Sequence, residues 1–340
     1  MNIGNVLVVS SRSPHLATFL DTLRLGAQVR LAVIFLIFSL VTLSIPAVCG
    51  VTCGREPVRI ARHRIDLDFC RDVLAERRED WPKYAEFARR KPDSLSALAR
   101  ESLDIVRYGI VVEPESPDIP RMLRIAAQAY SGLFVVDRAA GKRVSWPVGN
   151  QEFVYQGQSV DESIVHAGRW LEAFHLAMIC REEGLLDALC RTTSDRLRKS
   201  STKYPEYVYL QVDAYRAYWK GEGGVFRLLL EALRRTDPQA EKDINVDYTL
   251  YLAVPLIEVT ARCITRDENR FQDALSRSVQ LHKEYYSANS NRADDRKGFI
   301  SLALAAMAAH AHDKGIRFDV QTPYLPAMFV SGDCFRRQAK

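Results

Sequence analysis

Two histidines near the C-terminus, His310 and His312, stand beside Asp313 and have the residue types of a metal or hydrolase site. They lie at the end of a segment, residues 298–312, whose apolar spacing predicts a helix. Residues two apart on a helix point about 200° away from each other around its axis, so the two imidazoles cannot face one ion. Cationic side chains are favourable at a helix C-terminus, which explains His312 and Lys314 without any metal. The spacing therefore predicts no metal site here.

A second pair of histidines, His166 and His175, lies on another predicted helix. The two residues are nine positions apart, roughly two and a half helical turns, so we expect them on opposite faces. No GxSxG, GxxxxGK, GxGxxG or HExxH motif occurs in the 340 residues. We therefore expect no catalytic residue, no metal and no cofactor. A Ser-His or Cys-His pair that meets only in space stays open as an alternative.

The cysteines argue against a disulfide framework and against a zinc site. Seven cysteines are scattered along the chain without a CxxC pair: Cys49, Cys53, Cys70, Cys180, Cys190, Cys263 and Cys334. Secreted disulfide frameworks usually have an even number in a short chain, and zinc sites usually have paired spacings. We interpret most of these thiols as small apolar side chains on helices, reduced in a cytosol.

Charged and aromatic clusters offer surfaces for a partner rather than for chemistry. Basic residues gather at Arg191, Arg196, Arg198, Lys199 and Lys203, and could bind an acidic partner, although a solvated face is the simpler interpretation. Tyrosines are dense in residues 204–219, where most should be core residues, although protein interfaces also use them. The acidic pairs 182–183 and 294–295 fall near predicted helix ends, where carboxylates cap helices or face solvent. The partner-binding residues stay unknown from the sequence.

The elements that position these residues are mostly helices. Apolar residues three to four apart predict helices over the following segments: 65–78, 92–106, 122–130, 164–178, 207–218, 225–233, 246–263, 271–285 and 298–312. We expect Gly184 to end the fourth, Pro255 to kink the seventh, and residues 221–224 to form a glycine turn between two antiparallel helices. Such helical hairpins predict a solenoid-like array, of the tetratricopeptide kind, although that repeat's signature is present only in fragments.

One stretch changes to a two-residue period. Residues 133–136, 144–146 and 153–155 are short runs of β-branched and aromatic residues, with turn residues between them. The sequence therefore predicts a small β-hairpin insertion near residues 133–155 in an otherwise mostly α protein.

The N-terminal residues 1–56 differ from the rest. Leu31 to Gly54 is a run of 24 residues without a charge, long enough for a membrane-spanning helix, although Pro46 weakens its second half. A membrane anchor, a cleaved export signal and an extension outside the functional protein are three alternatives. Seven basic and two acidic residues precede position 65. By the positive-inside rule, these basic residues place the C-terminal body in the cytoplasm and make export the poorest fit; under the anchor alternative, the body is attached to the inner membrane.

The rest of the chain carries no net charge, because its 40 basic residues balance its 40 acidic ones. A neutral body has no general electrostatic attraction to a phosphate backbone, so we expect no nucleic-acid partner. These observations favour a helical protein that binds another protein over an enzyme.

The C-terminal half resembles the immunity protein 49 family of bacterial polymorphic toxin systems. The resemblance rests on GRWLEAF at residues 168–174, Tyr218-Trp219, KGFISLAL at residues 297–304, DKGI at residues 313–316 and TPYLP at residues 322–326. It extends over roughly residues 59–330 and is strongest after position 160.

The resemblance implies a mostly helical immunity domain over residues 57–335 that binds and neutralises a cognate toxin protein, without catalysis. Trp170, Phe174, Tyr218 and Trp219 are expected in the core rather than at the interface, because most of them lie on apolar stripes. The alternative function is a helical-repeat adaptor or scaffold for another complex, with membrane contact through Leu31 to Gly54 left open.

Overall fold

Helices dominate the computed structural model, which describes residues 57–336 apart from residue 140 and residues 157–159 and 239–243. Its main helices are α3 (Leu67–Arg90), α4 (Leu95–Val112), α5 (Asp118–Arg138), α6 (Ala167–Cys180), α7 (Glu183–Cys190), α9 (Glu206–Trp219), α10 (Val225–Arg234), α12 (Val254–Thr265), α13 (Glu268–Ser287) and α15 (Leu302–Asp313). Shorter helices are η2 (Pro92–Ser94), α8 (Ser194–Arg198), α11 (Val246–Tyr248), α14 (Ser290–Ala293), η4 (Arg296–Gly298), α16 (Ala327–Ser331) and α17 (Asp333–Arg336). The mostly α fold class is confirmed. The segment from Leu31 to Gly54, with the rest of residues 1–56, lies outside the described residues.

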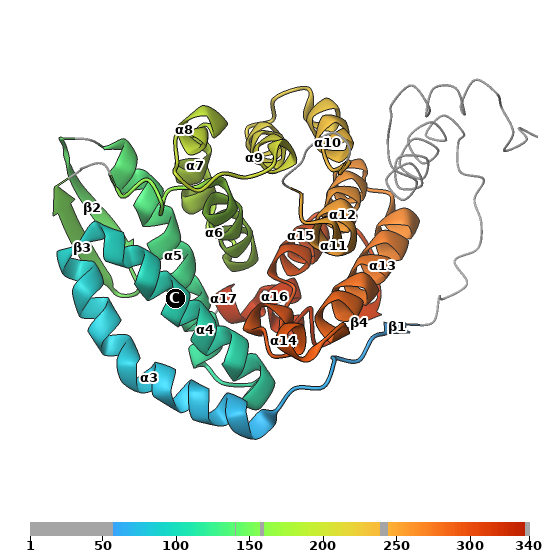
Figure 1. Cartoon of the computed structure of the whole chain (residues 1–340), viewed down its shortest axis with the longest axis horizontal. Coiled ribbons are helices and arrows are strands. Elements are labelled where there is room, and N and C mark those ends of the chain that lie inside the picture. Colours follow the sequence, from blue (N-terminus) through green and yellow to red (C-terminus); the bar gives the residue numbers. More distant parts are fainter. Residues whose placement is uncertain (1–56, 140, 157–159, 239–243, 337–340) are drawn as a thin grey trace, which may run out of the picture.

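The helices follow one another in an arc, from α3 through α9 and α10 to α13, and α15 to α17 return through the middle (Figure 1). Neighbours in sequence pack together, as in the pairs α3 with α4, α4 with α5, α9 with α10 and α12 with α13. A short turn over residues 221–224 joins α9 to α10, as the sequence predicts. Helices that are neighbours in the sequence therefore pack in pairs, and the solenoid-like array stays a prediction.

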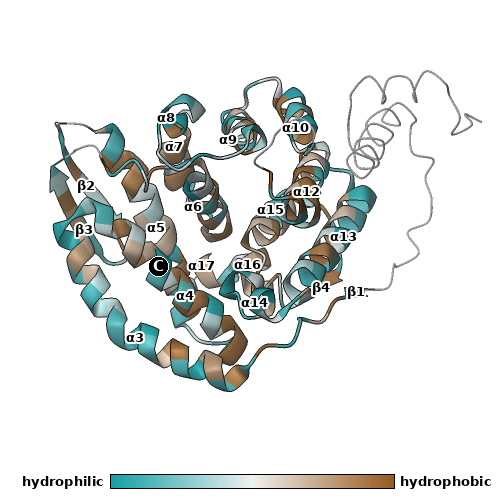
Figure 2. Cartoon of the chain, in the orientation of Figure 1, coloured by the Kyte–Doolittle hydropathy of each residue, from teal (hydrophilic) through white to brown (hydrophobic). Residues whose placement is uncertain are grey.

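The helices α3, α4 and α5 pack against one another in the order of the sequence. Asp66 caps α3, because its carboxylate accepts the backbone N–H groups of Asp68 and Phe69 at 3.0 Å each. Behind this outer helix, α4 and α5 are buried along most of their length. Figure 2 shows the same contrast, since α3 is largely hydrophilic whereas hydrophobic residues predominate in α5. One continuous cluster of buried apolar residues runs from Ile60 to Phe335.

The predicted β segment at residues 133–136 is wrong, because these residues form the end of α5. Leu133, Phe134 and Val136 are fully buried, since α5 is covered on several sides by its neighbours. A helix buried all round needs no polar face, so a continuous apolar run is compatible with it. The rest of the β prediction is confirmed: β2 (Arg143–Val148) and β3 (Gln151–Gln156) are antiparallel, with Trp146 opposite Phe153. A two-residue turn at residues 149–150 joins them.

The end of α6 also differs from the expectation. This helix stops at Cys180, where Arg181 adopts a left-handed conformation with φ of 59°. Gly184, which was expected to end it, lies inside the next helix, α7. The Arg181 guanidinium stabilises the bend, because it donates to the carbonyl oxygens of Ile179 at 2.6 Å and Val330 at 2.6 Å. The end of α6 therefore depends on a contact with Val330, 149 residues further along the chain.

The helix predicted over residues 246–263 is interrupted. After α11, residues Thr249–Ala253 form a π-helical turn (η3), and α12 begins at Val254. Pro255 follows directly; a proline ring removes one N–H donor and crowds the carbonyl four residues earlier, which favours such an irregularity. The expected kink at Pro255 is thus present as a π turn.

A second pair of strands joins the two ends of the described chain. β1 (Val58–Arg59) pairs in parallel with β4 (Val320–Gln321), which sequence patterning does not predict because each strand is two residues long. The Arg62 guanidinium donates to the Pro323 carbonyl at 2.8 Å, and the His63 ring lies 2.7 Å from the Tyr324 hydroxyl. We refer to residues 58–63 as the N-terminal strap.

No helix among the described residues is both long enough and apolar enough to cross a membrane.

Candidate functional site

A cavity in the described part of the molecule has a volume of about 600 Å³. It lies between the start of α6, the start of α9, the segment from α11 to α12, the middle of α13 and the start of α15, and one residue of α4 reaches it. A volume of this size is within the usual range for ligand-binding pockets. The cavity is therefore the candidate functional site.

Its first wall is the beginning of α6. His166 caps this helix, because its Nδ1 atom accepts the backbone N–H of Arg169 at 3.1 Å. Tyr204 lies 3.0 Å from the same nitrogen, so the tyrosine hydroxyl donates and the ring proton of His166 is on Nε2. Burial, together with the charge of Arg169, lowers the pKa of His166 to about 4. His166 is therefore a neutral hydrogen-bonding group at physiological pH.

Gly168 allows this arrangement. A Cβ atom at position 168 would lie 2.5 Å from the Tyr204 hydroxyl oxygen and 2.7 Å from Cζ of the same ring. A side chain here would push Tyr204 off the helix, since contacts this short do not occur between nonbonded atoms. The close approach of Tyr204 to α6 therefore requires glycine.

A second histidine of the cavity belongs to a directed chain of hydrogen bonds. The Thr260 hydroxyl donates to the Leu256 carbonyl at 2.8 Å, so its oxygen accepts from Tyr215, 3.2 Å away. Tyr215 in turn accepts from Nε2 of His175 at 3.4 Å. Complete burial lowers the pKa of His175 to about 4. His175 is thus fixed by its neighbours as a neutral imidazole.

The third histidine lies at the opposite wall. His282 on α13 donates from Nε2 to the carbonyl of Gly298 at 3.1 Å, and burial lowers its pKa to about 4. The ring of Tyr286 packs on it, with ring centroids 4.7 Å apart. Gly298 makes room for that ring, because a Cβ atom there would lie 2.4 Å from Cδ1 of Tyr286. His63 also stacks on Tyr286, with ring centroids 6.4 Å apart, so the N-terminal strap packs against this wall.

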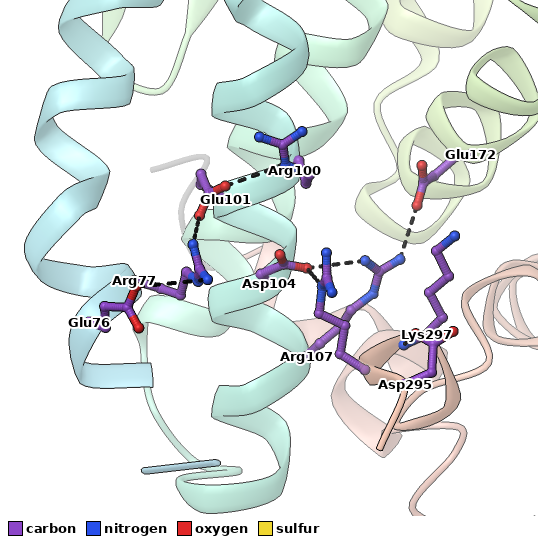
Figure 3. A network of polar contacts seen from close by, with 10 residues as sticks. Glu76, Arg77, Arg100, Glu101, Asp104, Arg107, Glu172, Asp295 and Lys297 are labelled. Carbon is purple, nitrogen blue, oxygen red and sulfur yellow. Dashed lines mark hydrogen bonds and ion pairs between the residues drawn. The ribbon is translucent and has the colours of Figure 1, made fainter. Parts of the chain in front are cut away.

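Charged residues enter the cavity beside these rings. Arg107 on α4 is buried, and its two terminal nitrogens donate to Asp104 at 3.3 Å and to Glu172 at 3.0 Å. Arg296 on η4 donates from Nε to the same Asp104 at 2.6 Å. Figure 3 shows these residues as a network that joins α4 to α6 and η4, with Lys297 beside Arg107. A buried network of this kind holds three elements in register.

The sequence-predicted histidine pairs have mixed outcomes. His310 and His312 point apart as expected: His310 lies 2.7 Å from the Tyr218 hydroxyl, whereas His312 is exposed beside Asp313. The prediction for His166 and His175 is wrong, because both line the same cavity. His166 is the cap of α6 rather than a residue within it, so helical periodicity does not apply to it. Among the described residues, no group of three or more His, Cys, Asp or Glu side chains could hold a metal ion.

The basic stretch at residues 191–203 is used mostly inside the molecule. Arg196 pairs with Asp137 at 2.5 Å, and Arg198 pairs with Glu206 at 2.5 Å. Lys203 donates to the carbonyl of Arg198 at 2.8 Å. Lys199 is exposed at the end of α8. Arg196 and Arg198 therefore fasten α8 to α5 and α9, whereas Arg191 and Lys199 stay exposed.

The aromatic residues divide between core and cavity. Trp170 and Phe174 are buried and stacked at 4.9 Å, which places them in the core as expected. Tyr218 and Trp219 are partly buried and bond to His310 and Asp187. Five tyrosines line the cavity: Tyr204, Tyr207, Tyr248, Tyr251 and Tyr286. Two of these five lie in the tyrosine-rich stretch; the other three come from segments far along the sequence.

The described cysteines are free thiols, and four of them are buried: Cys70, Cys180, Cys190 and Cys263. Burial raises the pKa of Cys70 and of Cys190 to about 11. These thiols are therefore protonated apolar side chains, as the sequence suggests. Cys49 and Cys53 lie outside the described residues.

Comparison with protein families gives one match. The model of the family Immunity protein 49 matches residues 114–329, from the loop before α5 to α16. The chain belongs to the immunity protein 49 family. No curated protein and no solved structure matched the chain in two further comparisons.

Two of the segments that carry the family resemblance meet at the cavity. In residues 168–174, Gly168, Arg169 and Glu172 line it, while Trp170 and Phe174 point to the core. In residues 297–304, Lys297 and residues 300–304 line it. These segments are more than a hundred residues apart in the sequence. Both segments therefore contribute side chains to the same cavity.

Proposed function

We propose that this protein is an immunity protein that binds and neutralises one cognate toxin effector of a bacterial polymorphic toxin system. The observation that carries the proposal is the family match over residues 114–329, which includes every helix around the cavity except α4. Residues 57–335 would act as the immunity domain. Neutralisation would occur by binding, without catalysis, because affinity between proteins comes from a few well-packed anchors.

The neighbouring side chains support a binding role. The three cavity histidines are neutral and engaged in hydrogen bonds to protein groups, and the thiols have raised pKa values. Such groups are held for packing rather than poised for proton transfer or nucleophilic attack. We expect the body to act in the cytoplasm, by the charge argument at the N-terminus. Its partner would be a toxin protein rather than nucleic acid, since the body carries no net charge.

The test is co-expression with the adjacent gene. An immunity gene should lie beside the gene of its toxin, whose product should stop growth when expressed alone. Growth should return when this chain is expressed with it, and the two proteins should co-purify. Toxicity that persists in the presence of this chain, with no complex formed, would contradict the proposal. A complex with several unrelated proteins would instead support the adaptor alternative.

A further inference from the structure

Two cations at the cavity have no carboxylate partner among the described residues. Arg169 donates to the Ser96 hydroxyl, its guanidinium lies 5.2 Å from the centre of the Tyr130 ring, and its Nε atom is buried without a hydrogen bond. Lys297 is exposed, and within the described part of the chain no acidic side chain forms an ion pair with its amine. Among the described residues, the one carboxylate that lines the cavity, Glu172, is held by Arg107 at 3.0 Å. The described lining therefore has an excess of positive charge.

We propose that this cavity is the toxin-binding site and that it receives an acidic segment of the toxin, whose carboxylates pair with Arg169 and Lys297. The inference rests on the proposed function and specifies where and by what chemistry it operates. The two cations come from different elements, Arg169 from α6 and Lys297 from η4. An acidic segment in the cavity would have its charge neutralised by both of them, where the described lining offers no carboxylate partner.

The rest of the lining fits a protein segment. Five tyrosines surround the cations, and Tyr248 has 45% of its surface exposed although it lines a cavity. Tyrosine and arginine are the residues that contribute most to protein interfaces, because they combine apolar area with hydrogen-bonding ends. The hydroxyl and imidazole groups also supply hydrogen bonds for a peptide backbone.

The other positively charged region is a poorer choice for the same partner. Two of its three arginines, Arg196 and Arg198, already have carboxylate partners at 2.5 Å. An incoming acidic segment would have to displace Asp137 or Glu206 to pair with them, and it would gain little. Arg191 and Lys199 are exposed outside the cavity, where water screens an ion pair. The cations of the cavity need no exchange of partners, and they lie beside the tyrosines.

The test uses charge reversal at one exposed lysine. Lys297→Glu should weaken binding to the product of the adjacent toxin gene about tenfold or more, because a repulsion replaces an ion pair. Lys199→Glu, which reverses an exposed lysine on the basic stretch, is the matched control and should leave the affinity within about twofold. Arg169→Gln should weaken binding as well. The affinities of the unmodified chain and of the three variants for the toxin are measured by titration calorimetry on the full chain. Thermal melts verify that each variant folds.

A second measurement locates the partner directly. A photo-crosslinking amino acid at Tyr251, inside the cavity, should attach to an acidic segment of the toxin. The same group at Phe226, exposed on α10, should not. Full binding by Lys297→Glu together with a crosslink only at Phe226 would overturn the cavity proposal while the proposed function stands. If the unmodified chain neither binds nor protects, the proposed function itself fails, and the cavity proposal fails with it.

Discussion

At the scale of single residues, Gly168 controls how closely Tyr204 packs on α6. Gly168→Ala should destabilise the protein by about 1–3 kcal/mol, since the new methyl group would overlap the Tyr204 hydroxyl. Gly184→Ala is the matched control, because no atom lies within 4 Å of the new methyl group. That variant should be unchanged or up to about 1 kcal/mol more stable, from higher helix propensity. Urea unfolding of the two variants measures the difference; equal stabilities would contradict the packing argument.

Asp104 has a larger expected effect because it is buried between two arginines. Asp104→Asn keeps the size of the side chain and removes the charge that Arg107 and Arg296 share. The loss should be about 3 kcal/mol, the lower end of the cost of breaking a buried ion pair, because Arg107 keeps Glu172 and Arg296 is partly exposed. Glu86→Gln breaks the exposed ion pair with Arg90 and should cost less than about 1 kcal/mol. A small effect of Asp104→Asn in the same unfolding assay would show that water already screens the network.

At the scale of elements, the N-terminal strap tests whether two short strands matter. A chain without residues 1–56 keeps the strap and should fold. A chain without residues 1–64 loses the β1–β4 pair, the Arg62 hydrogen bond to Pro323 and the His63–Tyr324 contact. Its melting temperature should be several degrees lower, since about 1 kcal/mol shifts the midpoint by roughly 2–4 °C in a protein of this size. Identical melting curves would show that the strap adds no stability.

The elements also show what the sequence can predict. Amphipathic helices such as α9 and α10 are predictable, because one polar face and a glycine turn define them locally. The end of α5 is not, because a helix covered on all sides loses the period that identifies it. The end of α6 depends on Arg181, which bonds to residues about 150 positions away.

The candidate site was beyond prediction for a related reason. His166, His175 and His282 come from a helix cap, the middle of α6 and the middle of α13, and no single periodicity relates them. The closest signal was the tyrosine-rich stretch, which supplies Tyr204 and Tyr207 to the cavity. The absence of a catalytic motif gave no guide to a binding site, because the residues of a protein-binding surface have no fixed spacing along the sequence.

At the scale of the whole molecule, stability should depend on the buried histidines. The pKa values of His166, His175, His282 and His310 are each lowered to about 4, mainly by burial, from an ordinary value of 6.5. Below pH 6.5 the unfolded chain therefore binds more protons than the folded one, and stability falls as the pH decreases toward 4. The loss should be on the order of 3 kcal/mol for each of the two completely buried rings, His175 and His282.

Chemical unfolding at pH 7, 6, 5 and 4.5 measures this dependence. His282→Gln should reduce the slope between pH 6.5 and 4, because one titrating group is gone. His312→Gln is the control, since this exposed side chain adds no buried group. A stability that is constant from pH 7 to pH 4.5 would contradict the assignment of neutral buried imidazoles.

The strap has a consequence for the order of events during synthesis. His63 and Tyr324 are 261 residues apart, so the ribosome must add nearly the whole chain before these two side chains can meet. At about 5–20 residues per second, the strap emerges roughly 10–50 s before its partner exists. Contacts this distant also slow folding, because the loop between them must close first. The strap therefore stays without its partner until residues 320–324 have been synthesised, so these contacts are among the last that the fold acquires.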